Sequence, residues 1–136
     1  MPCPCGSKLL FHKCCKLYHD GRLPDSAEKL MRSRFSAYAV GNADYIIDTT
    51  HPANPGYTTE RATWKEDIGR FCTLTQFIAL EVLATADGAT PDESFVEFRA
   101  TLTQLGKDAS FTERSKFLRV DGKWFYVAGV VESGLA

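Results

Sequence analysis

Four cysteines near the start of the chain are the side chains best suited to do chemistry. They are Cys3, Cys5, Cys14 and Cys15, in the pattern C-x-C-x8-C-C. Adjacent cysteines such as the last two cannot bridge each other without strain, so the spacing does not favour a disulfide scaffold. Four thiolates in one short segment suit a tetrahedral ion that imposes no geometry of its own. The pattern therefore predicts zinc.

The number of ligands decides what such an ion does. Four protein ligands close the coordination sphere and leave no position for water, so we expect one structural Zn²⁺. His12 and His19 are alternatives for one of the four ligands, and with either histidine the sphere is still closed. A redox-active disulfide is the rival interpretation, but the segment has no C-x-x-C spacing and no signal of a lowered thiol pKa.

Basic side chains flank the cysteines. Residues 1–22 hold more basic than acidic side chains, whereas the whole chain has a formal net charge of −1. Zinc bound by four thiolates is net negative, and Lys8, Lys13 and Lys16 partly offset that charge. The basic patch is too small to indicate a nucleic acid as a sequence-specific target.

Composition places the chain among ordinary globular proteins. It has 136 residues, of which 44% are hydrophobic and 24% charged, values typical of one folded domain. The uncharged runs are too short to span a bilayer, so no membrane segment is predicted. The amino terminus lacks the charged and apolar regions of a secretory signal, which predicts a cytoplasmic location. Cys72 stands alone in an apolar setting and is interpreted as a small buried hydrophobe.

Hydrophobic periodicity divides the chain into helices and strands. Residues 21–24 form the expected linker between a module at 1–22 and a body at 23–136. The helical period predicts three helices, at about 26–40, 44–50 and 58–71. The period then changes from helical to alternating, which predicts strands at 73–84, 93–105, 110–120 and 123–131. Helices followed by an antiparallel meander indicate an α+β domain, with helices on one face of a curved sheet.

Polar residues fall at positions that the pattern assigns to the interior. In strand 110–120, Glu113 and Ser115 share the inward face with two phenylalanines. Arg34 lies on the inner stripe of the first helix. A buried carboxylate is costly unless it is paired, and a guanidinium fits it in bidentate geometry. We therefore expect Glu113 to pair with Arg34, or with Arg32, between helix and sheet.

Two alternatives stay open for these polar residues. In the first, a pocket binds a ligand through Arg34, Tyr45, His51, Glu113 and Ser115, because such clusters often mark sites. In the second, the arginine simply extends its guanidinium to water. His51 is a candidate general base if a carboxylate orients it, and otherwise a hydrogen-bonded residue at a helix end. No Ser-His-Asp order, phosphate loop or open metal site is present, so a non-enzymatic protein is expected.

The cysteine segment resembles a known zinc element. The letters CPCGS, an aromatic residue and then adjacent cysteines are similar to the SEC-C motif at the carboxyl end of the SecA translocation ATPase. The motif has Cys or His as its last ligand, so all four cysteines match it position for position. The motif usually has Gly after the Ser, where this chain has Lys8. In the ATPase the motif engages the chaperone SecB, and the resemblance implies contact with a protein or ribosome partner.

The whole chain resembles the YchJ family. The resemblance rests on the blocks LMRSRF (30–35), ADYI (43–46), THP (50–52), ERSKF (113–117) and GKWFYVAG (122–129). Family members join a SEC-C element to a body resembling the nuclear-transport-factor-2-like (NTF2-like) fold. This implies a cone of about three helices on an antiparallel sheet of about four strands. Many members carry a second SEC-C copy at the carboxyl end, and residues up to Ala136 contain none. Folds of this kind commonly dimerise through the sheet.

The family has no settled activity, so the resemblance does not name a function. We expect a zinc-binding, non-enzymatic protein that contacts a protein or ribosome partner through its SEC-C element. The alternative is a small-molecule binder or enzyme that uses a polar pocket of the cone.

Overall fold

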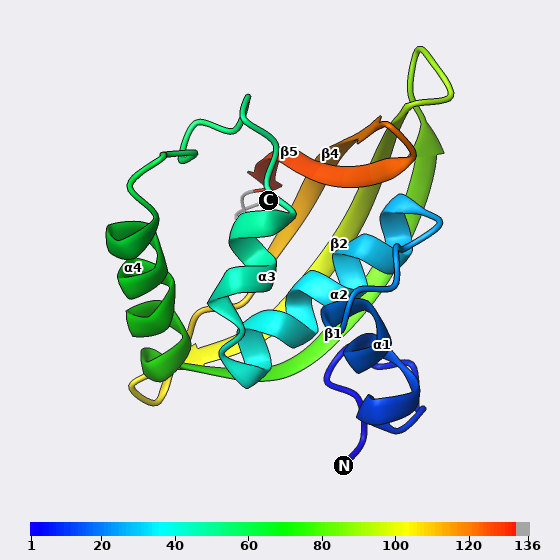
Figure 1. Ribbon diagram of the computed structural model, residues 1–136. Helices are drawn as coiled ribbons and strands as arrows, with labels where there is room; N and C mark the ends of the chain where they lie inside the picture. The colour runs from blue at the N-terminus through cyan, green and yellow to red at the C-terminus, as the bar shows by residue number, and fades with distance from the viewer. Residues whose placement is uncertain (133–136) are drawn as a thin grey trace.

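Helices occupy the first half of the chain and strands the second half in the computed structural model, which describes residues 1–132 (Figure 1). A short 3-10 turn (Phe11–Lys13) precedes four helices, which are α1 (Cys15–His19), α2 (Ala27–Val40), α3 (Ala43–Asp48) and α4 (Arg61–Leu74). The strands are β1 (Thr75–Asp87), β2 (Glu93–Gln104), β3 (Lys107–Asp108), β4 (Phe111–Val120) and β5 (Lys123–Glu132).

Capping residues set the ends of the two central helices. Ser26 begins α2, and its hydroxyl accepts a hydrogen bond from the backbone N–H of Lys29 at 3.1 Å. Gly41 ends α2 in the left-handed conformation, with φ 76°, which favours glycine. Asn42 then caps α3 by accepting from the N–H of Tyr45 at 3.1 Å. The two helices are therefore joined by a sharp turn that fixes α3 beside α2.

The sheet is antiparallel, with its long strands in the order β1-β2-β4-β5 and β3 paired to β2. Asp121 and Gly122, with φ of 51° and 79°, form the tight turn between β4 and β5 that their sequence predicts. A register shift between Lys116 and Phe117 interrupts the pairing of β4 with β5. Such shifts bend a sheet, and the sheet curves around α2 and α3 (Figure 1).

The core lies between α2 and the inner face of the sheet. From α2 it takes Leu30 and Phe35, and from β2 it takes alternate residues that begin at Val96. Phe117 of β4 is completely buried in this cluster. A second cluster joins the end of α2 to α3 and α4 through small and branched residues such as Ile46.

The predicted α+β architecture is confirmed, with helices on one face of a curved antiparallel sheet. The prediction missed the 3-10 turn, α1 and β3. It ended α4 at 71 and began the first strand at 73, whereas α4 continues to Leu74 and β1 begins at Thr75. Within residues 1–132, no helix combines the length and the apolar character needed to cross a bilayer.

Candidate metal centre and internal cavity

The four cysteines of the amino-terminal segment converge on one point. Their Sγ atoms all lie within 4.8 Å of one another, and they are Cys3, Cys5, Cys14 and Cys15. The Sγ atom of Cys14 lies 3.7 Å from that of Cys5 and 4.0 Å from that of Cys15. A tetrahedral ion with Zn–S bonds of about 2.3 Å separates its sulfurs by about 3.8 Å. The two measured separations are close to this value, so the cluster is compatible with a tetrahedral metal ion, and neither His12 nor His19 belongs to it.

A tight turn brings the first two cysteines to the cluster. Gly6 has φ 81° and Lys8 has φ 70°, so both adopt the left-handed conformation that favours glycine. Lys8 stands where the motif usually has Gly, and it adopts a left-handed conformation that is most easily reached by glycine. The turn is closed by the N–H of Cys3, which donates to the carbonyl of Leu9 at 2.8 Å. The Oγ of Ser7 lies 3.2 Å from the Sγ of Cys14.

The thiols are arranged to hold negative charge. A hydrogen bond from Cys15 lowers the pKa of Cys5 to about 4, against the opposing effect of burial. The same hydrogen bond, together with burial, raises the pKa of Cys15. Burial also raises the pKa of Cys14. One thiolate is thus stabilised by neighbouring thiol protons, which is the role a bound cation takes over when it displaces those protons.

Polar contacts fasten this module, residues 1–22, to helix α2. Arg32 of α2 donates to the carbonyl of Cys5 at 2.8 Å, and its Nε also donates to Glu28 at 3.1 Å. His19 donates through Nε2 to the carbonyl of Ser33 at 2.8 Å. Burial lowers the pKa of His19, so this imidazole is held neutral as a tie between α1 and α2.

Two closer contacts bring the cysteine turn against the body. The Sγ of Cys3 lies 3.4 Å from the hydroxyl of Ser36, and both residues are buried. At Gly6 an added Cβ would lie 3.1 Å from the carbonyl oxygen of Leu80 in β1. Glycine is therefore favoured at this position both by its φ and by the neighbouring strand. The module packs on α2 and β1.

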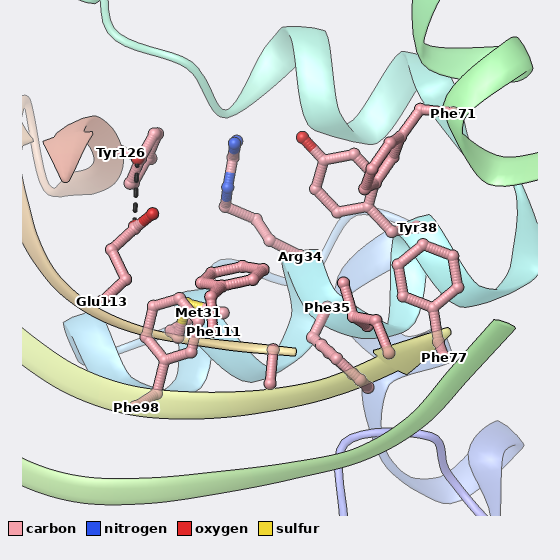
Figure 2. A pocket seen from close by; sticks show the side chains of 12 residues that line it. Met31, Arg34, Phe35, Tyr38, Phe71, Phe77, Phe98, Phe111, Glu113 and Tyr126 are labelled. Atoms are coloured by element: carbon pink, nitrogen blue, oxygen red, sulfur yellow. Dashed lines mark hydrogen bonds between the residues drawn. The ribbon is translucent and has the colours of Figure 1, made fainter. Parts of the chain in front are cut away.

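A second candidate site is a cavity of about 160 Å³ between α2, α4 and the inner face of the sheet. Its walls are mostly aromatic, and its charged members are Arg34 and Glu113 (Figure 2). The twelve lining residues are Met31, Arg34, Phe35, Tyr38, Phe71, Phe77, Phe98, Ala100, Leu102, Phe111, Glu113 and Tyr126.

Arg34 is buried, with 6% of its surface exposed. Its Nη1 donates to the carbonyl of Ile46 at 3.0 Å and to the hydroxyls of Thr49 and Thr50 at 2.7 and 3.2 Å. These acceptors lie at the carboxyl end of α3, where the helix dipole favours a cation. The guanidinium also lies over the ring of Tyr126, 4.6 Å from its centre. Burial lowers the pKa of Arg34, but an arginine stays charged at neutral pH.

Glu113 lies across the cavity on β4. Its Oε2 accepts hydrogen bonds from the hydroxyl of Tyr126 at 3.1 Å and from that of Ser115. A Cβ at Gly129 of the neighbouring strand would overlap this carboxylate, so the absent side chain makes room for it. Ser115 is completely buried, and its hydrogen bond helps to fix the position of the Glu113 carboxylate.

The predicted ion pair is wrong. Among residues 1–132, no arginine nitrogen lies within 4.0 Å of the Glu113 carboxylate, and Arg32 pairs with Glu28 instead. The inward orientation of Arg34, Glu113 and Ser115 is as predicted. The pair fails because each side chain has nearer polar partners on its own side of the cavity.

Of the five residues of the predicted pocket, only Arg34 and Glu113 line the cavity. Ser115 bonds to Glu113 from outside the lining, and the other two lie elsewhere. The hydroxyl of Tyr45 is 2.7 Å from that of Ser33, and burial raises the pKa of Tyr45 to about 12. His51 lines a separate surface depression and accepts a backbone hydrogen bond at Nδ1. Asp48 is paired with Arg61 at 3.0 Å. Among residues 1–132 no carboxylate is hydrogen-bonded to His51, which agrees with its interpretation as a residue at a helix end.

Most of the aromatic wall was not predicted from the sequence. Phe77 of β1 meets Phe35 edge to face, with ring centres 5.8 Å apart, and also meets Phe71 of α4. Tyr38 stacks on Phe77 at 6.1 Å. Tyr38 and Phe35 lie on the inner stripe of α2, and this periodicity is the signal that was available. Phe71 and Phe77 meet only because the chain reverses direction between α4 and β1.

Fold and site together define a class: an NTF2-like domain with a SEC-C element at its amino end. Residues 26–129 match the family model for "YchJ, middle NTF2-like domain". A UPF0225 protein of Photorhabdus laumondii is 41% identical over 131 residues, which cover 94% of this chain and 79% of the relative. The chain belongs to the YchJ (UPF0225) family, as its sequence blocks predict.

Solved structures agree with this assignment. A SEC-C motif containing protein from Rhodopseudomonas palustris is 32% identical, with a TM-score of 0.80 over 98% of this chain and 100% of that chain. Another, from Psychrobacter arcticus, is 26% identical, with a TM-score of 0.78 over 100% of this chain and 85% of that chain. Both are similar to this protein through module and body together.

Proposed function

We propose that Cys3, Cys5, Cys14 and Cys15 bind one Zn²⁺ in a closed structural centre, and that the protein is a binding protein without a catalytic role. The observation that carries this proposal is the spacing of the sulfurs, which matches the edges of a zinc tetrahedron. Buried thiols with shared hydrogen bonds also suit an ion that replaces their protons.

The ion would supply four strong bonds where the module has few apolar contacts of its own. Its local cluster consists of the cysteines and Phe11, which is too small a core to hold the segment. Hydrogen bonds of Arg32 and His19 then attach the module to α2. In this view the module is a structural support for the helix that carries Arg34.

Metal analysis tests the proposal. We expect about one zinc per chain, and cobalt substitution should give the intense absorption of a tetrahedral tetrathiolate site. Cys72→Ser is the control, because Cys72 lies in the body and outside the cluster, and it should leave both results unchanged. A metal-free protein with an ordered segment at residues 1–20, or an ion with an exchangeable water, contradicts the proposal.

The outer face of the module supports contact with another protein or the ribosome. Leu9 and Leu10 are 54% and 44% exposed, and Lys8 and Lys13 beside them are also exposed. Apolar residues surrounded by lysines suit a partner surface with apolar residues and a negative rim.

Substitution of this face provides the test. Leu9→Ser with Leu10→Ser should reduce co-sedimentation with ribosomes, or binding to a purified chaperone, at least tenfold. The matched control is Leu105→Ser, because Leu105 is more exposed than either leucine but lies on a distant turn. Equal binding by all three proteins contradicts the contact.

The cavity favours a second candidate function, the binding of a small molecule. It is largely apolar with a few polar groups that face inward, a composition typical of ligand sites. Within the described residues it holds no nucleophile paired with a base, since His51 and Tyr45 lie outside it. The arrangement can bind and orient a ligand through Arg34 and Glu113.

A further inference from the structure

Arg34 is a buried cation that forms no ion pair within residues 1–132, and the Glu113 carboxylate faces the same cavity beyond ion-pair distance. Only 6% of the surface of Arg34 is exposed. Among residues 1–132, no carboxylate oxygen lies within 4.0 Å of its guanidinium. Its partners are one carbonyl and two hydroxyls, which are neutral. Burying a guanidinium is unfavourable unless an anion and further hydrogen bonds compensate it. A negatively charged group within hydrogen-bond distance would complete the surroundings of this guanidinium.

Two side-chain nitrogens of Arg34 have no hydrogen-bond partner among residues 1–132. The three hydrogen bonds to α3 all come from Nη1, and residues 1–132 provide none to Nε or Nη2. Trp124 Nε1 is the one fully enclosed side-chain nitrogen or oxygen without a partner in the described chain. Nε and Nη2 are therefore not fully enclosed, and Arg34 is one of the residues that line the cavity (Figure 2).

Glu113 supplies the complementary group. Its Oε2 accepts from Tyr126 and Ser115, and within residues 1–132 no hydrogen bond engages Oε1. A carboxylate oxygen in such a position accepts from a donor and repels an anion. A ligand with both a negative group and a donor can satisfy the two sides at once, with the negative group toward Arg34 and the donor toward Glu113.

The size and lining of the cavity indicate what the apolar part of the ligand would be. A cavity of about 160 Å³ is close to the cavity of about 150 Å³ that holds a benzene ring in another protein. Phe77, Phe98 and Phe111 line the walls, and aromatic walls favour a planar ring. A single ring with one or two small substituents matches this space.

We propose that the cavity binds a single-ring aromatic carboxylate that also carries a hydroxyl or amino donor. The carboxylate accepts hydrogen bonds from Arg34, the donor is oriented by Glu113, and the ring lies among the phenylalanines. The proposal rests on the cavity being a small-molecule site, the second function proposed above.

Binding of simple ring compounds to the zinc-loaded full chain tests the proposal. The probes are 4-hydroxybenzoate, benzoate and the neutral 4-hydroxybenzyl alcohol, and their affinities are measured by calorimetry and by protein-observed NMR. We expect 4-hydroxybenzoate to bind at least tenfold more tightly than the neutral analogue. Benzoate, which lacks the donor, should bind with intermediate affinity.

Variants then separate charge from shape. Arg34→Met should abolish the preference for the anion, while Arg34→Lys should keep part of it because the positive charge remains. Glu113→Gln should reduce the difference in affinity between 4-hydroxybenzoate and benzoate. The control is Arg99→Met, because Arg99 is exposed on the outer face of β2 and its loss should change no affinity. Arg34→Met also removes three hydrogen bonds to the end of α3, so the unfolding midpoints of both Arg34 variants are measured beside their affinities.

The outcomes distinguish the inference from the function on which it rests. If neutral rings bind as tightly as 4-hydroxybenzoate, the cavity is a ligand site and the carboxylate assignment is overturned. If no probe binds, or if binding leaves the signals of the cavity residues unchanged, the small-molecule function and the assignment both fail. A marked loss of stability in both Arg34→Met and Arg34→Lys overturns the ligand role, because Arg34 would then be a structural tie.

Discussion

Replacing Cys14 and Cys15 together by serine is expected to disorder residues 1–20 and to lower the free energy of unfolding by about 4 kcal/mol or more, the range of a lost structural metal. The module and the body share buried surface, since Cys3 contacts Ser36 and both are buried. Loss of the module therefore exposes part of α2 as well. The effect should appear in NMR signals of both segments and in the denaturation midpoint.

Removal of the metal by a strong chelator should reproduce the effect of the double variant in the unchanged chain. Cys72→Ser provides the matched control, because it removes a thiol outside the cluster. If residues 1–20 lose order while the midpoint stays the same, the module is an independent appendage and does not support α2. If neither changes, the cysteines have no structural role.

The features that the sequence predicts well are those set by local pattern. The four cysteines lie within a short segment, so their spacing alone brings them together once Gly6 turns the chain. Alternation places Ser115 and Phe117 on the inner face of β4, and both are completely buried. In each case a period or a spacing of a few residues determines the result.

The partners of inward polar groups depend on contacts that no local pattern contains. Arg34 is held by Thr49 and Thr50 because the turn at Gly41 folds the end of α3 back over α2. Backbone hydrogen bonds also tie Thr49 and His51 to Tyr126 of β5, and the Tyr126 side chain contacts both charged residues, Arg34 with its ring and Glu113 with its hydroxyl. The expected ion pair was wrong because charge and inward orientation only narrow the set of possible partners. They do not determine which of those partners lies nearest in the folded chain.

The cavity was only partly predictable for the same reason. Its lining comes from α2, α4 and the long strands, which are far apart in the sequence. A pattern identifies an inward face, but the volume left between inward faces depends on how far the sheet bends. The register shift at Phe117 contributes to that bend.

Phe117→Ala is expected to lower the free energy of unfolding by about 3–5 kcal/mol, as is typical when a large buried aromatic side chain is truncated. Phe117 has no exposed surface and lies in the main core cluster with Leu30 and Phe35. Its ring also meets that of Tyr126 edge to face, with centres 5.7 Å apart. Urea denaturation followed by circular dichroism measures the change.

Phe95→Ala is the matched control for this prediction. Phe95 lies on the outer face of β2, where it is half-buried beneath the guanidinium of Arg114, so its truncation should cost about 1 kcal/mol. Similar losses of unfolding free energy for the two variants would mean that the outer face is covered in solution, as in a dimer formed through the sheet.

A milder substitution, Phe117→Leu, should preserve the fold better than Phe117→Ala. It should still weaken the hydrogen bond from Tyr126 to Glu113, because the Tyr126 ring packs on Phe117. Core packing and the candidate ligand site thus depend on the same ring.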